Sequence, residues 1–310
     1  MELIRGIHNL RQEHAGCVLT IGNFDGVHRG HQAVLTKLRE QAELLSLPSC
    51  VMVFEPQPLE FFAPGKAPAR LSRLRDKYED IAALGIDRML CVKFDRAFSK
   101  LTAEQFIEQI LLRQLDVRFL VIGDDFRFGA HRLGDFALLA EAGKKHGFQV
   151  LSTDTLLHDQ QRVSSTLLRE ALKDGRLDDV AHMLGHSYVI SGRVAHGAKL
   201  GRTIGFPTAN IHLKRLIAPL QGVFAVQIEI NGIRHPGVAN IGFRPTVNGT
   251  RSQLEVHIFD FEEDLYGKQL QIRICHKLRD EQKFPSFTAL QTQITADALH
   301  AREWLATHQC

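Results

Sequence analysis

The sequence predicts an α/β domain followed by a smaller β domain. Through about residue 155, apolar β-type runs alternate with helical patterns, which is typical of a Rossmann-like parallel sheet covered by helices on both faces. From residue 187 onward, strands follow one another with short turns, which is typical of a small antiparallel β-barrel. We therefore expect two domains, at residues 1–185 and 186–310.

The first domain has five expected strands, each an apolar run. They lie near residues 17–22, 49–54, 88–94, 117–123 and 148–153. Amphipathic patterns predict helices near residues 31–45, 71–84, 103–115 and 134–146, and two short ones near 165–173 and 177–184. Ligands bind beyond the carboxyl ends of parallel strands, so the candidate binding loops are residues 23–29, 55–62 and 123–129.

The second domain has five expected strands and a terminal helix. The strands lie near residues 187–195, 222–230, 233–241, 252–261 and 268–278. Asn231-Gly232 separates two of them and is typical of a two-residue hairpin turn. A final amphipathic helix is expected near residues 286–306, after Pro285.

Composition limits the class of protein. A chain of 310 residues with 44% hydrophobic residues is long enough for two cores. The formal charge of +3, without a run of about five like charges, gives no reason to expect a nucleic-acid partner. The sequence shows neither a signal peptide nor about 18 consecutive apolar residues, so we expect a cytoplasmic protein without membrane partners. The oligomeric state is left open.

The cysteines point to the same compartment. Five cysteines are an odd number, and no C-x-x-C spacing occurs. Cys17, Cys50 and Cys91 fall within expected core strands. We therefore expect reduced thiols.

The stretch from Gly22 to His31 carries the strongest local signal, because two histidines three residues apart follow an apolar strand. An expected tight turn at Asp25-Gly26 places His28 and His31 at the start of a helix. Unpaired N–H groups and the positive end of the helix dipole attract anions there, and glycines allow a phosphate close to the backbone. The alternative is a pair of ordinary surface histidines, which the combination of strand, glycines and spacing disfavours.

Phosphate chemistry must follow an uncommon pattern here. Neither a G-x-x-x-x-G-K-[ST] loop nor a G-x-G-x-x-G fingerprint occurs, so the usual kinase and dehydrogenase folds lose support. A histidine pair at a helix start can stabilise charge on a transferred phosphoryl group without a covalent intermediate, which favours nucleotidyl transfer. Val163–Arg169 offers a second anion contact, although alone it is better explained by a helix N-cap with a solvated arginine.

Residues 201–210 join a glycine-flanked loop to two small oxygen-bearing side chains. Thr208 and Asn210 alternate in an extended segment, so both side chains can face one side. Neutral oxygen ligands suit a Mg²⁺ ion that also binds oxygens of ATP. Taken alone, a Gly-Pro turn capped by Thr and Asn is the simpler explanation.

A candidate base lies in the run Leu254–Phe259, which alternates as a strand and places Glu255 and His257 on one face. If that face points into the barrel mouth, Glu255 can remove a proton from a substrate hydroxyl as it attacks the γ-phosphate of ATP. If it points to water, Glu255 is an ordinary exposed strand residue. The sequence leaves both alternatives open.

Along essentially its entire length, the sequence resembles the bacterial bifunctional riboflavin kinase/FAD synthetase family. The motifs that carry this resemblance are Gly22–His31, Phe54–Pro58, Gly123–Gly129, Ser164–Arg169, Gly201–Asn210, Gly237–Gly242, Arg244–Val247, Leu254–Phe261 and Lys277–Glu281. The resemblance implies an amino-terminal nucleotidyltransferase that joins the AMP part of ATP to FMN, giving FAD and pyrophosphate. It implies a carboxyl-terminal kinase that makes FMN from riboflavin and ATP, and Mg²⁺ for both reactions.

The resemblance also implies roles for individual residues. Expected contacts of the ATP phosphates in the first domain are His28, His31, Asn23, Ser164, Thr166 and Arg169. Expected flavin contacts are Asp125, Phe126 and Arg279, although Phe54, Phe126 and Phe128 suit core positions equally well. In the second domain, Thr208 and Asn210 would bind Mg²⁺ and Glu255 would act as base on the ribityl 5′-hydroxyl. Gly201 and Arg202 would contact the nucleotide in a flap at residues 196–202, and Phe224 replaces an expected Tyr.

Two other functions are compatible with parts of the sequence. An enzyme restricted to nucleotidyl transfer would use the barrel as a structural appendage, and riboflavin-dependent ADP formation discriminates against it. A non-catalytic flavin or nucleotide sensor would bind its ligands without turning over ATP. The presence of all the expected catalytic residues argues against the sensor.

Overall fold

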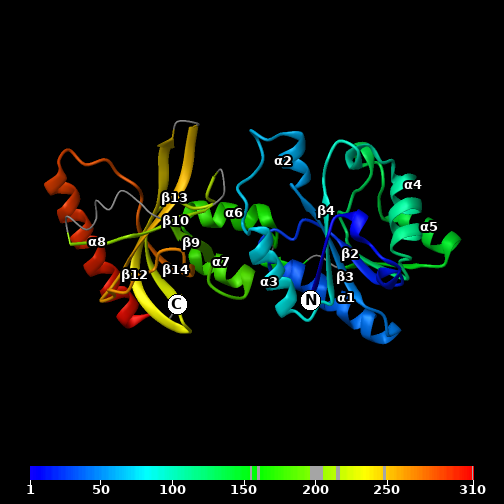
Figure 1. The fold of residues 1–310 in the computed structure, drawn as a ribbon, viewed down its shortest axis with the longest axis horizontal. Helices are drawn as coiled ribbons and strands as arrows, with labels where there is room; N and C mark the ends of the chain where they lie inside the picture. The colour runs from blue at the N-terminus through cyan, green and yellow to red at the C-terminus, as the bar shows by residue number, and fades with distance from the viewer. Residues whose placement is uncertain (154–155, 159–160, 196–204, 214–216, 247–248, 309) are drawn as a thin grey trace. The chain divides into compact units, whose positions relative to one another are not determined.

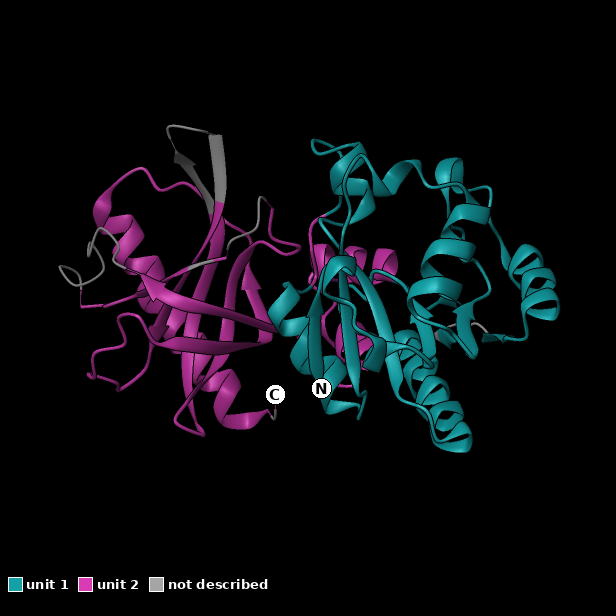
Figure 2. Ribbon diagram, turned by 45° about the vertical axis from the view of Figure 1, so that its right-hand side comes forward, with its two compact units in different colours: residues 1–68, 72–164 teal, residues 69–71, 165–310 magenta. Residues whose placement is uncertain are grey.

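The structure, a computed structural model, describes residues 1–310 apart from 154–155, 159–160, 196–204, 214–216, 247–248 and 309. The chain divides into two compact units (Figure 2). Unit 1 comprises residues 1–68 and 72–164, and unit 2 comprises residues 69–71 and 165–310. Within the described residues, no helix is long and apolar enough to cross a membrane.

Unit 1 is built on a six-stranded parallel sheet, which confirms the expected fold class. Its strands are β1 (Glu2–Arg5), β2 (Val18–Ile21), β3 (Ser49–Glu55), β4 (Arg88–Lys93), β5 (Phe119–Gly123) and β6 (Gln149–Thr153). They lie side by side in the order β1-β4-β3-β2-β5-β6. Strands β2, β3 and β4 are labelled in Figure 1. Sequence reasoning missed β1, because this edge strand has four residues and buries only Ile4.

Helices cover both faces of this sheet. They are α1 (Arg29–Leu45), α3 (Leu74–Ala83), α4 (Ala103–Gln105), which continues as a π-helix over Phe106–Gln114, and α5 (Phe136–His146). The short helix α2 (Pro58–Phe62) follows β3 and buries no residue. Neighbouring residues of β2 point to opposite faces: Val18 packs with Leu35 of α1, and Leu19 packs with Leu111 of the π-helix. The strands are therefore buried on both sides, which explains their continuous apolar runs.

The strand order reverses at β2, which pairs with β3 on one side and with β5 on the other. In open parallel sheets, ligands bind beyond the carboxyl ends of the strands at such a reversal. The loops that follow β2 and β5 therefore flank the expected ligand position. A small hairpin, β7 (Leu157–His158) and β8 (Gln161–Arg162), follows the sheet.

Unit 2 is a closed antiparallel barrel with a terminal helix, as expected. After α6 (Ser165–Asp174) and α7 (Leu177–Leu184), its strands are β9 (Val189–Ala195), β10 (Ala209–His212), β11 (Gly222–Ile230), β12 (Ile233–Thr246), β13 (Gly249–Ile258) and β14 (Gln269–Arg279), and α8 spans Phe287–Thr307. The barrel order is β10-β13-β12-β11-β14-β9. The short strand β10 was expected only as an extended segment. Asn231 and Gly232 both have positive φ, 52° and 79°, as a two-residue hairpin turn requires.

Successive side chains of β11 point alternately into the barrel and toward α8. Val223 and Ala225 pack with Ala298 and Ala301 of α8. Phe224, between them in sequence, is fully buried and points to the opposite side, into the barrel. Phe in place of the expected Tyr leaves no hydroxyl at this interior position.

The cysteine prediction is wrong for two of the five residues. Cys275 on β14 and Cys310 at the carboxyl terminus form a disulfide bond. Their sequence separation of 35 residues and the absence of a motif gave no local signal, because packing of α8 brings them together. Cys17, Cys50 and Cys91 are buried and are not in disulfide bonds, as expected.

Helices α6 and α7 belong to the compact unit that contains the barrel. Val180 and Met183 of α7 are fully buried, and α7 contacts β14. Two hydrogen bonds also hold the segment 69–71 in this unit, because Tyr188 Oη donates to Leu71 O at 2.7 Å and Arg169 Nε donates to Ala69 O at 2.6 Å. The compact unit thus begins before the expected boundary at residues 185 and 186.

Candidate active sites

The loop between β2 and α1 is tightly wound and clamped. Phe24 and Val27 have positive φ values of 47° and 38°, and Gly26 supplies a third left-handed residue at 85°. Ser72 donates its backbone N–H to Asp25 Oδ1 at 3.1 Å, and its Oγ accepts from Gly26 N at 3.1 Å. Asp25 is 2% exposed, so this clamp is internal and sets the path of the chain into α1.

His28 and His31 form a stacked pair at the start of α1. His28 is the N-cap, and its Nδ1 accepts from the backbone N–H of His31 at 3.3 Å. The two rings are 3.7 Å apart between centroids and nearly parallel, at 17°. His28 is only 5% exposed, so the pair is not the ordinary surface feature that the alternative describes. Because Nδ1 of His28 accepts, its neutral ring carries the proton on Nε2.

The glycines of this loop also have a structural reason within the folded chain. A Cβ atom at Gly22 would lie 3.0 Å from the ring of Phe24. A Cβ atom at Gly30 would lie 3.2 Å from the ring of His28 and 3.3 Å from a backbone oxygen. These glycines therefore make room for the loop's own side chains, and Gly26 serves the turn through its positive φ.

The surroundings of His31 keep its ring neutral. Burial away from water holds the pKa of His31 well below its usual range, and repulsion by His28 adds to this. Lys77 and Arg162 lower the pKa further. Nδ1 of His31 is buried and has no hydrogen-bond partner among the described residues. A buried polar atom without a partner, beside the N–H groups of a helix start, fits a site that an anionic ligand completes.

Lys77 and Arg162 are functional candidates that sequence reasoning missed. Lys77 on α3 is 1% exposed, although a lysine in an amphipathic pattern is normally assigned to the solvent face. Arg162 of β8 pairs with Asp125 at 2.9 Å and with Asp124 at 3.0 Å. Arg162 thus connects the exposed loop after β5, which contains Asp125, with His31, whose pKa it lowers. The position of Arg162 just before the Ser164–Arg169 motif was the available sequence signal.

Phenylalanine rings gather at the carboxyl ends of β3 and β4. Neighbouring rings in the cluster lie 5.2–5.7 Å apart between centroids, and its members are Phe54, Phe61, Phe62, Phe94 and Phe98. Phe62 is 64% exposed and presents an apolar ring to solvent. Phe126 stacks on the buried Phe128 at 5.6 Å and packs against the core. The aromatic surface open to a planar ligand therefore includes Phe62, which sequence reasoning did not single out.

The remaining expected phosphate contacts of the first domain are divided between the two units. Asn23 is exposed in the loop after β2, and Ser164, the last residue of unit 1, is half-buried. Thr166 is exposed in the first turn of α6 in unit 2. Arg169 lies in the same helix, where its guanidinium donates to Ser165 O at 3.0 Å and to Ala69 O at 2.6 Å.

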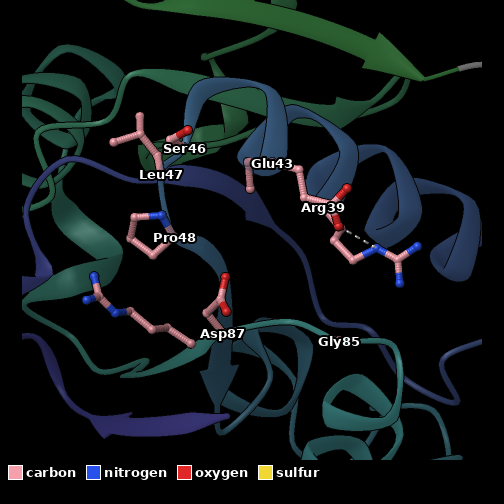
Figure 3. Close-up of a pocket in the computed structure, with 9 residues that line it drawn as sticks. Arg39, Glu43, Ser46, Leu47, Pro48, Gly85 and Asp87 are labelled. Atoms are coloured by element: carbon pink, nitrogen blue, oxygen red, sulfur yellow. Dashed lines mark ion pairs between the residues drawn. The ribbon is translucent and has the colours of Figure 1, made fainter.

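A cavity of about 500 Å³ lies at the opposite end of the sheet (Figure 3). It is lined by residues at the end of α1, including Arg39 and Glu43, and by residues that precede or begin β3 and β4, including Pro48 and Asp87. The carboxylate of Asp87 already accepts two hydrogen bonds from Ser49, from its backbone N–H at 2.8 Å and from its Oγ at 2.7 Å. The cavity thus adjoins the amino ends of the strands and is separate from the histidine pair.

A second constellation lies on the outer surface of the barrel. Glu255 of β13 is directly opposite Asn210 of β10 on one side and Asn240 of β12 on the other. Residues directly opposite each other on paired strands share a face of the sheet. His257, two residues after Glu255 on β13, is opposite Val238, and Val238 packs against α8, so this face is the outer one. Leu254 and Val256 are fully buried in the barrel. The predicted alternation along this strand is confirmed. The side chain of Glu255 lies outside the barrel interior, but it is half-buried and therefore not fully exposed to water.

The side chains of Asn210 and Glu255 are linked by Gln253. Its Nε2 donates to Asn210 Oδ1 and to Glu255 Oε1, the latter at 3.0 Å. His257 Nδ1 forms a 2.8 Å hydrogen bond with Pro207 O, which holds the segment that carries the half-buried Thr208 against β13. Amide, hydroxyl and carboxylate oxygens are the ligands that Mg²⁺ prefers, so the donor set fits that ion.

Arg279 of β14 forms an ion pair within unit 2. Its guanidinium binds both oxygens of Asp297 of α8, at 2.7 Å for the shortest contact, and lies 5.7 Å from the ring centre of Phe284. Asp297 is 6% exposed, so this pair anchors α8 to the barrel. Gly201 and Arg202, together with the expected flap at residues 196–202, lie outside the described residues.

Comparisons with known proteins cover both units. The family model described as FAD synthetase matches residues 10–167, and the one described as riboflavin kinase matches residues 184–305. A bifunctional riboflavin kinase/FMN adenylyltransferase of Escherichia coli is 56% identical over 98% of both chains. One of Haemophilus influenzae is 51% identical, over 97% of this chain and 98% of its own.

A solved structure has the same fold over nearly the whole chain. It is described as a macrolide-efflux protein from Streptococcus pneumoniae, and it is 28% identical with a TM-score of 0.81. The match covers 98% of this chain and all of that one. The two family models, over residues 10–167 and 184–305, and the curated relatives, over nearly the whole chain, thus agree on one type of protein.

Proposed function

We propose that this chain, which belongs to the family of bifunctional riboflavin kinase/FMN adenylyltransferases, has two active sites, one for each of its two reactions. It phosphorylates riboflavin with ATP, giving FMN and ADP. It also transfers AMP from ATP to FMN, giving FAD and pyrophosphate. Our functional division is residues 1–185 for adenylyl transfer and 186–310 for riboflavin phosphorylation, and the extents of the two family models support it.

Adenylyl transfer takes place beside the stacked histidines. The attacking FMN phosphate and the triphosphate of ATP both carry negative charge, and charge builds on the departing pyrophosphate. His28 and His31, with the N–H groups at the start of α1, bind those phosphates and stabilise that charge. Asn23, Ser164, Thr166 and Arg169 are assigned to the same phosphates.

Flavin contacts of the adenylyl-transfer site are assigned to the loop after β5 and to the phenylalanine cluster. Asp125 and Phe126 line the ligand end of the sheet, and the exposed ring of Phe62 offers a surface on which a planar isoalloxazine can stack. Arg279 is assigned to the flavin of the kinase site, where its pairing with Asp297 holds it in place.

Riboflavin phosphorylation takes place on the outer surface of the barrel. Glu255 accepts the proton of the ribityl 5′-hydroxyl, which makes that oxygen a better nucleophile for the γ-phosphorus of ATP. Thr208 and Asn210 are assigned to Mg²⁺, which when bound supplies charge neutralisation on the phosphate oxygens. Gly201 and Arg202 are assigned to the nucleotide. Since both reactions consume ATP, we also propose that the enzyme works in the cytoplasm.

The observation that supports the kinase site most directly is the alignment of Asn210 with Glu255 across β10 and β13, joined by Gln253. The test is incubation of the purified chain with riboflavin, ATP and Mg²⁺, followed by separation of the flavins. We expect FMN to appear first and FAD to follow. FAD formation from FMN without any phosphorylation of riboflavin would overturn the kinase assignment and leave the adenylyl transfer.

A further inference from the structure

Gln253 lies between the residues assigned to the metal ion and to proton transfer, and it touches both. Its Nε2 donates to Glu255 Oε1 at 3.0 Å and to Asn210 Oδ1. A side-chain amide nitrogen carries two hydrogens, so both are used in these contacts. Gln253 and Asn210 are separated by 43 residues in the sequence, and only the pairing of β10 with β13 brings them together.

The chemistry of these side chains determines which atom faces which. An ionised carboxylate can only accept hydrogen bonds, so the Gln253 atom that faces Glu255 is the NH₂ group. The same NH₂ group faces Asn210, so the Asn210 atom that it meets is the carbonyl oxygen. The Glu255 carboxylate therefore orients the amide of Gln253, and Gln253 in turn orients the amide of Asn210, with the Asn210 oxygen toward the NH₂ group of Gln253.

We propose that Gln253 is a positioning residue of the kinase site, which holds the Asn210 oxygen and the Glu255 carboxylate in one fixed arrangement. This rests on the roles proposed above for Asn210 and Glu255. An amide oxygen has two acceptor positions, so Asn210 can bind a cation while it still accepts from Gln253. Partners that orient a metal ligand in this way typically contribute about 10–100-fold to metal affinity or activity.

The position of β13 in the barrel is held by contacts other than the side-chain amide of Gln253. The backbone of Gln253 pairs with Gly242 of β12 and His212 of β10 in the regular ladder. Its sequence neighbours Ser252 and Leu254 are buried, at 7% and 0% exposure, and hold the strand from the inner side. Removal of the amide should therefore leave the fold intact and change only the outer surface.

The experiment compares two substitutions in the full-length chain. Gln253→Met keeps the length of the side chain and removes both donors, and Gln253→Glu replaces the donors by a carboxylate. Gln271→Met, at an exposed position on β14, is the matched control. The first measurement is the side-chain amide NMR signal of Asn210 in metal-free protein, which should shift in both Gln253 variants and stay unchanged in the control.

The second measurement is the riboflavin kinase reaction as a function of Mg²⁺ concentration. Both Gln253 variants should lower kcat by about 10–100-fold and leave FAD formation from FMN unchanged. Gln253→Met should raise the Mg²⁺ concentration for half-maximal rate, because the oxygens are no longer held together. Gln253→Glu should lower it, because an added carboxylate attracts a dication. Opposite shifts in Mg²⁺ dependence are not expected of a purely structural residue.

The proposal is overturned if both variants keep the parent kcat, or if both shift the Mg²⁺ dependence in the same direction together with a lower Tm. Glu255→Gln, assayed in parallel, distinguishes failure of the positioning role of Gln253 from failure of the proposed function. If Glu255→Gln abolishes phosphorylation while Gln253→Met retains it, the positioning role alone is wrong. If Glu255→Gln itself phosphorylates riboflavin normally, the assignment of the base is wrong.

Discussion

The imidazole rings of His28 and His31 stack 3.7 Å apart, and the backbone N–H of His31 donates to the ring of His28. One histidine thus caps α1 and at the same time supports the other. The pair is held by the loop after β2 at the reversal of strand order, where parallel sheets bind their ligands. Its geometry motivates the first two predictions.

Substitution of either histidine should impair adenylyl transfer alone. His28→Ala or His31→Ala should lower FAD formation from FMN by about a hundredfold or more, the scale of losing one preorganised group that stabilises developing charge. Phosphorylation of riboflavin should continue at the parent rate. The measurement is separate assay of the two reactions, and near-normal adenylyl transfer in both variants would remove the catalytic role.

Stability should fall as the solution is made acidic, because of His31. The pKa of this ring is lowered in the folded state, so below about pH 6.5 the unfolded chain takes up a proton that the folded chain does not. Folding therefore loses stability as the pH falls, by about 1 kcal/mol over the first unit below 6.5. Urea unfolding at pH 7.5 and 5.5 measures this loss.

His31→Gln should show a smaller loss of stability between these two pH values than the parent protein. His146→Gln, at an exposed position of α5, is the matched control and should behave as the parent. An equal loss in the parent and in His31→Gln would show that other groups cause the acid sensitivity.

Glu255→Gln should abolish riboflavin phosphorylation and leave adenylyl transfer intact. Glutamine keeps the size and hydrogen-bonding capacity of the side chain but cannot accept a proton at neutral pH. With riboflavin as substrate, FMN and FAD should both nearly vanish, whereas FMN supplied directly should still give FAD at close to the parent rate. A simultaneous loss of adenylyl transfer would show that the sites are not separable.

The disulfide between Cys275 and Cys310 should stabilise unit 2. Cross-links that close loops of this size typically contribute about 2–4 kcal/mol to unfolding free energy. Cys310→Ser should lower the Tm of the oxidised protein, and dithiothreitol should lower the Tm of the parent but not that of Cys310→Ser. Titration of five thiols in the unfolded, unreduced parent would contradict the cross-link.

A carboxyl-terminal fragment should fold better when it includes α6 and α7. Fragment 165–310 keeps the burial of Val180, Met183 and Leu184, and fragment 186–310 loses it. Each such side chain contributes about 1.5–3 kcal/mol on burial, so the shorter fragment should unfold at lower urea concentration. Both should phosphorylate riboflavin where folded. Equal stability of the two would place the structural boundary at residue 185.

Much of the fold could be predicted because local patterns record which face of an element is buried. The alternation of Val18 and Leu19 between two cores, and of Phe224 between Val223 and Ala225, appears in the sequence as continuous or alternating apolar runs. The four-residue strands β1 and β10 could not be predicted in the same way, because so short a segment contains too few positions to establish a period.

The sequence by itself determined the two types of domain, the order of their elements and the residue types from which the sites are built. Tertiary structure alone decided which of these residues meet. Lys77 is buried where its charge acts on His31, Cys275 reaches Cys310, and Gln253 joins Asn210 to Glu255. Such contacts depend on strand register and helix packing between distant segments, and no local periodicity encodes them.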